Sequence, residues 1–135
     1  MIPIFLDTHY VVASINPKDQ HHQKAREWAA RIGDRPLLTT ESVIQEIGNS
    51  LARKHRKTAV DVIDLLRASQ EITVITVDTV LLNRGLNLYR TVMDQDWGLI
   101  DCISFVVMRE RGTTDALTYD HYFVQAGFNA LMRAG

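Results

Sequence analysis

The sequence has few of the features that mark secreted, membrane or fibrous proteins. It contains one cysteine, Cys102, so no internal disulfide can form, which favours a reducing compartment. No apolar stretch approaches the roughly 20 residues of a membrane span, and no basic segment followed by an apolar one marks a signal peptide. Repeats and linkers rich in Pro, Gly or Ser are also lacking. We therefore expect a cytoplasmic protein without membrane association.

An excess of charge of one sign is lacking as well. Lys and Arg number 15 against 16 for Asp and Glu, so no global basic field indicates nucleic-acid binding, although a local patch remains compatible with it. The 135 residues are 46% hydrophobic and 23% charged, which is ordinary for a globular protein. A chain of this length suits a single domain, 1–135, with a sizeable core.

Short apolar runs alternate with longer amphipathic patterns along the chain. The runs predict strands at 2–6, 36–40, 72–77, 115–119 and 129–132. The amphipathic patterns predict helices at 10–15, 25–32, from Thr40 or Ser42 to about Lys54, and at 59–66, 79–93 and 101–108. This alternation predicts an α/β fold, a three-layer α/β/α sandwich around a central, mostly parallel sheet of about five short strands.

Two carboxylates follow predicted strands in equivalent positions. Asp7 comes directly after 2–6, and Asp120 comes directly after 115–119. Open α/β sheets bind their ligands at the carboxyl ends of the strands, so the two carboxylates would meet there if these strands are neighbours. Helix capping is the plain alternative for Asp7, and Thr8 could also cap the helix that follows.

Two further acids lie on predicted helices. Asp101 falls in the first turn of an evenly apolar helix, where the helix dipole favours the ionised form. Glu46 shares a face with Asn49 and Arg53 beside the apolar stripe of its helix, where a solvated flank is the alternative. Four acids could therefore converge. Clustered carboxylates repel one another unless a cation neutralises them, and an all-oxygen ligand set suits Mg²⁺ or Mn²⁺.

Other polar residues also admit structural explanations. His21 and His22 could bind metal, but adjacent side chains diverge on a helix, which favours solvent exposure. The basic cluster at 53–57 suits a helix C-terminus, although Arg53, Lys54 and Arg56 could instead contact RNA phosphates. The two helices that it joins form a hairpin suited to a dimer or partner surface.

Four motifs occur in a characteristic order. They are FLDT at 5–8, TTESVIQEIGN at 39–49, WGLIDCISF at 97–105 and ALTYDHYF at 116–123, followed by AGF at 126–128. This pattern resembles that of PIN-domain proteins, close to the VapC-type toxins of bacterial toxin–antitoxin pairs. The resemblance implies that the catalytic and metal-binding acids are Asp7, Glu46, Asp101 and Asp120. It also implies that Thr8 and Thr118 orient the ligands, although capping or packing would explain both residues equally well.

The resemblance also implies a function. It is that of a Mg²⁺-dependent endoribonuclease, with Mn²⁺ as a possible substitute, that leaves 5′-phosphate and 3′-hydroxyl ends. Such a protein is the toxin of a type II toxin–antitoxin system, a homodimer blocked by a small antitoxin that places a basic residue among the acids. A catalytically inactive PIN-like module that binds RNA or protein is the alternative.

Three nearby acids leave the composition of the site open. Asp94 and Asp96 fall in a loop, where solvation is the simpler explanation. Asp115 begins its predicted strand, which places it at the opposite end of the sheet from Asp120.

Overall fold

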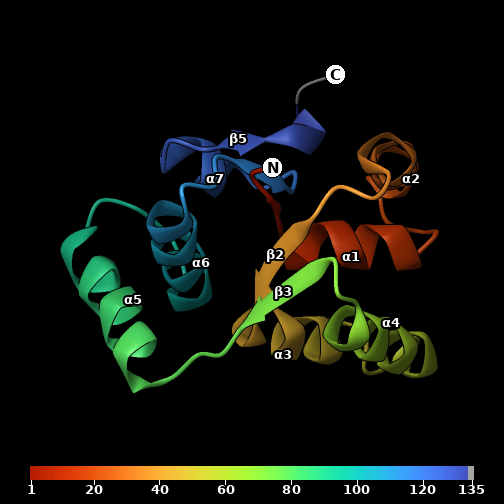
Figure 1. Ribbon diagram of the computed structural model, residues 1–135, viewed down its shortest axis with the longest axis horizontal. Coiled ribbons are helices and arrows are strands. Elements are labelled where there is room, and N and C mark those ends of the chain that lie inside the picture. Colours follow the sequence, from red (N-terminus) through yellow and green to blue (C-terminus); the bar gives the residue numbers. More distant parts are fainter. Residues whose placement is uncertain (134–135) are drawn as a thin grey trace.

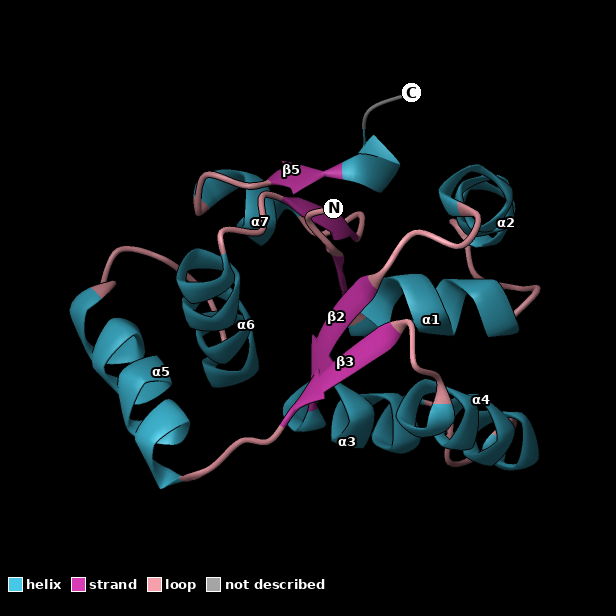
Figure 2. Cartoon of the chain, in the orientation of Figure 1, coloured by secondary structure: helices cyan, strands magenta, loops and turns pink. Residues whose placement is uncertain are grey.

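Five short strands form one sheet in the computed structural model, which describes residues 1–133 (Figures 1 and 2). Their order across the sheet is β3-β2-β1-β4-β5, and every neighbouring pair is parallel. The predicted parallel sheet of about five strands is therefore confirmed. The strands are β1 (Ile4–Leu6), β2 (Leu37–Thr40), β3 (Ile72–Ile75), β4 (Asp115–Leu117) and β5 (Asn129–Ala130).

Helices fill the crossovers between the strands. The chain runs from β1 to β3 in one direction and then crosses back to β4 and β5, so right-handed crossovers place α1–α4 on one face and α5–α7 on the other. Figure 1 shows these two groups on either side of the strands, which confirms the three-layer prediction. The helices are α1 (Thr8–Ile15), α2 (His22–Ile32), α3 (Glu41–Ser50), α4 (Arg56–Ala68), α5 (Thr79–Thr91), α6 (Leu99–Arg111) and α7 (His121–Gln125).

The core lies around β1 and α6. All three residues of β1 are buried, because this central strand is covered on both faces. Phe105 of α6 packs edge to face against Phe123 of α7, with ring centroids 4.9 Å apart. The evenly apolar helix is thus a central one, as predicted, and its N-terminal turn is held against the carboxyl edge of the sheet.

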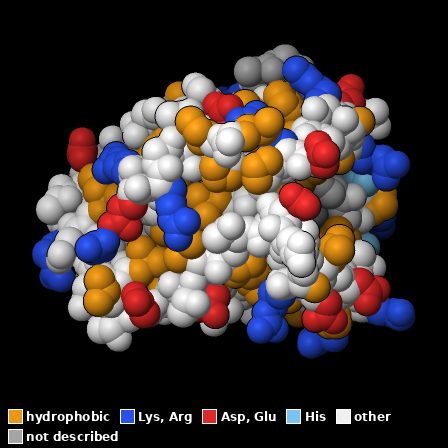
Figure 3. Space-filling model, in the orientation of Figure 1, with side chains coloured by type: hydrophobic (Ala, Val, Ile, Leu, Met, Phe, Trp, Pro, Cys, Tyr) orange, Lys and Arg blue, Asp and Glu red, His pale blue; other side chains and the backbone are white. Residues whose placement is uncertain are grey.

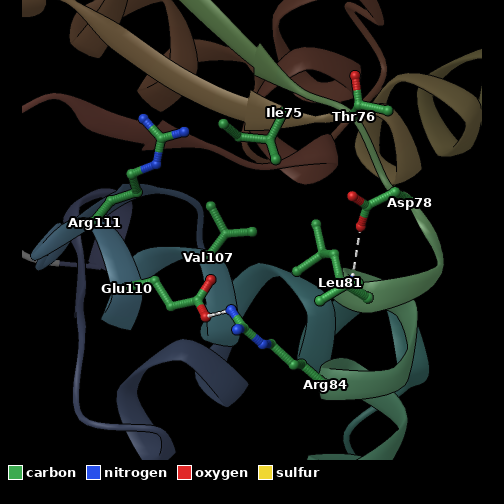
Figure 4. Close-up of a pocket in the computed structure, with 9 residues that line it drawn as sticks. Ile75, Thr76, Asp78, Leu81, Arg84, Val107, Glu110 and Arg111 are labelled. Carbon is green, nitrogen blue, oxygen red and sulfur yellow. Dashed lines mark hydrogen bonds and ion pairs between the residues drawn. The ribbon is translucent and has the colours of Figure 1, made fainter.

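The helices α5 and α6 approach each other closely at a glycine. A Cβ atom on Gly85 would lie 2.5 Å from Cγ1 of Ile103 and 3.3 Å from its Cα. Beside this contact, apolar and charged side chains together line a groove between the β3–α5 connection and α6, and the charged groups include the Arg84–Glu110 ion pair (Figure 4). On the face shown in Figure 3, apolar side chains lie among basic and acidic groups of both signs.

Several predicted boundaries are wrong. The strand β4 ends at Leu117 rather than at Tyr119, so Asp120 does not directly follow it. The helix α3 ends at Ser50 rather than near Lys54, because residues 51–54 turn to bring α4 back against α3. The edge strand β3 ends at Ile75, which pairs with the last residue of β2, so Val77 has no strand beside it and donates to Glu41 Oε1 at 2.8 Å instead. The last strand ends at Ala130, and the chain continues as a 3₁₀ turn over Leu131–Arg133.

No helix within residues 1–133 is both long enough and apolar enough to span a bilayer.

Candidate active site

The strands β1 and β4 are neighbours at the point where the chain reverses its direction across the sheet. The helix after β1 lies on one face and the helix after β4 lies on the other. Open parallel sheets bind ligands at such a switch point, beyond the carboxyl ends of the strands. Asp7 directly follows β1, and Asp120 lies three residues beyond Leu117, the end of β4. The strand pairing needed to bring these two carboxylates together is present.

Thr118 connects the two positions. Its side chain is fully buried, and its hydroxyl donates to Asp7 Oδ2 at 2.8 Å while accepting the backbone N–H of Asp120 at 2.9 Å. The backbone N–H of Asp7 also bonds to the carbonyl of Leu117 at 3.4 Å. One hydroxyl thus orients the Asp7 carboxylate and sets the backbone from which the Asp120 side chain projects.

The capping interpretation of Asp7 and Thr8 is wrong. Asp7 occupies the N-cap position of α1, but its side chain makes no capping hydrogen bond and instead accepts the Thr118 hydroxyl. Thr8 is the first residue of the helix, and its buried hydroxyl has no hydrogen-bond partner among the described residues. Both side chains are therefore available to a bound group at the sheet edge.

Asp101 and Glu46 approach the same edge from helices on opposite faces. Asp101 Oδ2 accepts the backbone N–H of Gly98 at 2.9 Å, which fixes this carboxylate in the first turn of α6. Glu46 is half-buried on α3. The helices α3 and α6 contact each other across the sheet edge.

The four acids interact electrostatically. Burial raises the pKa of Asp7 to about 7, against a lowering by the Thr118 hydrogen bond, and the charges of Asp101, Asp120 and Glu46 raise it further. Burial is also the main reason why the pKa of Asp101 rises to about 6, with Asp120 and Glu46 adding to the shift. The carboxylates therefore lie close enough to oppose each other's ionisation.

A hard divalent cation suits this donor set. The groups are all oxygen ligands, and a cation would relieve the repulsion that raises their pKa values. The unpartnered hydroxyl of Thr8 adds a buried polar atom that a water on such an ion would satisfy. Within residues 1–133, however, no three His, Cys, Asp or Glu side chains already stand at metal-binding spacing. The acids converge without forming a closed coordination cage.

Comparison with known proteins identifies the family. The chain matches the PIN domain over residues 4–129. The protein belongs to the PIN-domain family. The resemblance seen in its four motifs is thereby confirmed.

The relatives of this PIN domain include toxins. The chain is 28% identical over 126 residues to the 23S rRNA-specific endonuclease VapC20 of two Mycobacterium tuberculosis strains, covering 93% of this chain and 95% of the relative. The crystal structure of Mycobacterium tuberculosis VapC20, described as a sarcin–ricin loop cleaving toxin, matches with a TM-score of 0.86 and 26% identity. That match covers 95% of this chain and 98% of VapC20.

The three additional acids do not belong to the cluster of the PIN domain. Asp94 and Asp96 are exposed in the loop before α6. Asp115 lies at the amino end of β4, where it is 3.6 Å from Arg35 and accepts a hydrogen bond from Asn129 at 2.9 Å. None of the three contributes to the raised pKa values of the buried acids.

The basic cluster lies apart from the acids. Arg53, Lys54 and Arg56 are exposed around the turn between α3 and α4. Lys54 lines a hollow with Asn16, which ends α1, whereas Asp7 lies at the start of that helix. The basic turn is therefore at the far end of α1 from Asp7, and its contact with RNA remains a prediction.

An aromatic cluster that the sequence patterns do not predict lies beside the acids. His21 was expected to face solvent, but its ring stacks on Tyr119 at a centroid distance of 3.9 Å. His9 lies against both rings. The adjacent His22 points elsewhere, with Nδ1 2.7 Å from the carbonyl of Ala13. The sequence holds one indication of this cluster, which is the position of two of its members. His9 lies two residues after Asp7, and Tyr119 directly precedes Asp120.

Proposed function

We propose that this PIN-domain protein is a metal-dependent endoribonuclease and the toxin of a type II toxin–antitoxin system that acts in the cytoplasm. The observation that carries the proposal is the convergence of Asp7, Asp101, Asp120 and Glu46 on the switch point of the sheet. The likeness to a 23S rRNA-specific endonuclease over nearly the whole chain supports the same activity.

The four acids would hold Mg²⁺, with Mn²⁺ as a substitute. One or two bound ions would lower the pKa of a water and neutralise charge on the scissile phosphate. Thr118 keeps the Asp7 carboxylate aimed at the site, and the Gly98 N–H does the same for Asp101. Glu46 would position the water for attack on phosphorus, and cleavage of the P–O3′ bond would leave 5′-phosphate and 3′-hydroxyl ends. Arg53, Lys54 and Arg56 would hold more distant phosphates of the RNA.

Ribosomal RNA is the first substrate to test. The relative VapC20 is described as cleaving the sarcin–ricin loop, so a stem–loop of that sequence is the natural probe. The wild-type protein should cut it in Mg²⁺ and lose this activity in EDTA. Asp7→Asn should reduce the rate of cleavage by at least about 100-fold, because the asparagine amide cannot supply the anionic ligand. Full activity of Asp7→Asn in Mg²⁺ would refute the metal-dependent function.

The wild-type protein and the Asp7→Asn variant together can identify the RNA that is cut in the cell. Each protein is induced, and the ends of the cellular RNA are then sequenced. Ends that carry a 5′-phosphate and occur with the wild-type protein alone identify the cut. Identical ends in both samples would count against the nuclease.

The alternative function is a PIN-like module that binds RNA or protein without cleaving it. The absence of three acids at metal-binding spacing among the described residues favours this candidate. Millimolar Mg²⁺ or Mn²⁺ decides between the two functions, because ligands that bind only the folded state raise its melting temperature. A melting temperature unmoved by both ions would support the module, and a rise that Asp7→Asn abolishes would support the enzyme.

The partners are a small antitoxin and a second copy of the chain. The antitoxin would block the acidic site with a basic residue. We assign the homodimer to the α3–α4 hairpin, where Val60 and Leu65 of α4 are 52% and 64% exposed. Purification of the native operon should yield a tight complex with a small protein, and its absence would count against the toxin assignment.

A further inference from the structure

The aromatic cluster beside the acids is built from four separate segments of the chain. His9 comes from α1, His21 from the turn before α2, Tyr119 from the β4–α7 connection and Arg133 from the C-terminal 3₁₀ turn. The rings of His21 and Tyr119 are stacked with an interplanar angle of 21°, and His9 lies edge-on to His21 with centroids 5.0 Å apart. The Arg133 guanidinium carbon lies 4.8 Å from the centre of the Tyr119 ring.

Hydrogen bonds hold this cluster in place. The backbone N–H of Tyr119 donates to Nδ1 of His9 at 3.0 Å, so the neutral imidazole carries its proton on Nε2. The backbone N–H of His21 donates to Asp19 Oδ1 at 2.8 Å, and Arg133 Nη1 donates to the carbonyl of Tyr119 at 2.9 Å. The His9 ring, the Arg133 guanidinium and the backbone at His21 and Tyr119 therefore have little freedom to lose when a ligand binds.

The cluster is neither core nor ordinary surface. His9, His21 and Tyr119 are half-buried, and Arg133 is exposed. The three rings are thus partly exposed to solvent. Tyr119 directly precedes Asp120, and His9 lies one residue beyond Thr8. The cluster consequently borders the acidic site on the side of α2, whereas the basic turn lies at the far end of α1.

Unpaired RNA is the ligand that this chemistry fits. Bases that leave a stack are held on Tyr and His rings and on the planes of Arg guanidinium groups. Such stacking tolerates every base, because each has an aromatic face. The Arg133 charge and the rings also offer RNA a favourable contact next to carboxylates that repel its phosphates.

We propose that His21, Tyr119 and Arg133 form a subsite for one unpaired nucleobase next to the scissile phosphate, with His9 as the residue that positions Tyr119. The proposal rests on the ribonuclease function proposed above and names how that site holds its substrate. Stacking of a base on the cluster sets which phosphate of a flexible RNA lies over the acids.

The test compares two probes on the full chain carrying Asp7→Asn. One probe is fluorescein-labelled oligoadenylate, and the other is a ribose–phosphate chain of the same length without bases. Fluorescence anisotropy should show tighter binding of oligoadenylate. Tyr119→Ala or His21→Ala should weaken oligoadenylate binding about 10-fold and change binding of the abasic chain by less than about two-fold. Tyr119→Phe should retain the preference, because it keeps the ring.

A matched control separates the subsite from aromatic residues in general. Tyr89→Ala removes a ring that is 46% exposed on α5, outside the cluster, and should leave both affinities unchanged. Melting temperatures recorded for every variant identify losses of fold. Equal affinity of the Asp7→Asn protein for both probes would overturn the proposal. Equal weakening of both probes by Tyr119→Ala and His21→Ala would also overturn it.

Cleavage assays distinguish failure of this proposal from failure of the ribonuclease function. If the wild-type protein cuts RNA and the His21→Ala protein keeps the same KM, the subsite alone is wrong. If the wild-type protein cuts no RNA in Mg²⁺, the ribonuclease function is wrong. In that case, a preference for oligoadenylate over the abasic chain that disappears in Tyr119→Ala still supports the nucleobase subsite.

Discussion

The Asp7 carboxylate should make the stability of the metal-free protein depend on pH. Burial raises its pKa to about 7 in the folded chain, against 3.8 for an aspartate in the unfolded chain. The folded state therefore binds the proton more tightly than the unfolded state does. The stabilisation that this extra proton affinity of Asp7 provides is complete below pH 3.8. It is lost as the pH rises through about 7. Asp101, with its pKa raised to about 6, acts in the same direction.

We therefore predict that the metal-free protein becomes less stable between pH 5 and pH 7.5. The free energy of unfolding should fall by up to about 1.4 kcal/mol per pH unit for each group that only the folded state protonates. Denaturant unfolding in EDTA at a series of pH values measures this slope. Asp7→Asn should flatten the slope and raise stability at pH 7.5. A slope that is the same in both proteins would contradict the assignment of the proton to Asp7.

Thr118 and Thr113 provide a matched pair of buried threonines. Thr118→Val removes the hydroxyl that joins Asp7 to the Asp120 backbone, and we expect a loss of about 1–3 kcal/mol together with reduced cleavage. Thr113 is also buried, but its hydroxyl has no partner among the described residues. Thr113→Val should therefore be neutral or stabilising. Urea unfolding of both variants checks the prediction, and equal losses would contradict the bridging role of Thr118.

At the scale of elements, the packing of α5 on α6 depends on the lack of a side chain at Gly85. Gly85→Ala would gain helix propensity of about 1 kcal/mol, but its Cβ would lie 2.5 Å from Ile103. Because the neighbouring Cα of Ile103 is also close, the helices must separate. We expect a net loss of about 1–3 kcal/mol in thermal or urea unfolding.

The control is Gly48 of α3. A Cβ there would meet only the end of Ile63, at 3.9 Å, which is an ordinary contact. Gly48→Ala should therefore be neutral or stabilise the protein by up to about 1 kcal/mol. A similar destabilisation by both substitutions would show that space at Gly85 is not the cause.

The existence of most elements could be predicted from local patterns. The run at 72–77 is β-branched throughout its strand, and the apolar residues of α6 are too evenly spread for a surface helix. Element ends were predicted less well, because they depend on partners elsewhere. The sequence at 76–77 still favours a strand, but β2 has already ended at Thr40.

At the scale of the molecule, the sequence could indicate the acids but not their distances. The adjacency of β1 and β4 decides whether Asp7 and Asp120 meet, and parallel strand order has no local signature. The motifs resembling the PIN family supplied that information indirectly. The His21–Tyr119 stack was missed because it joins segments about a hundred residues apart with no shared periodicity.

The proposed homodimer gives a prediction at this scale. Leu65→Lys places a charge on the exposed face of α4 and should convert the dimer to a monomer, as measured by light scattering after size-exclusion chromatography. Val80→Lys makes the same kind of change at a side chain that is 59% exposed on α5. It should leave the mass unchanged. Dissociation by Val80→Lys alone would place the interface on α5 instead.

The hydrogen bond between Thr118 and Asp7 spans 111 positions of the chain. A polypeptide emerging from the ribosome carries Asp7 early, but the hydrogen-bond donor for that carboxylate is absent until Thr118 has been synthesised. We expect every nascent or prematurely terminated chain that stops before β4 to lack the assembled site. Under the proposed ribonuclease function, translation of this chain would then be safe for the ribosome that makes it, because the acidic site assembles only when synthesis has reached the late strands.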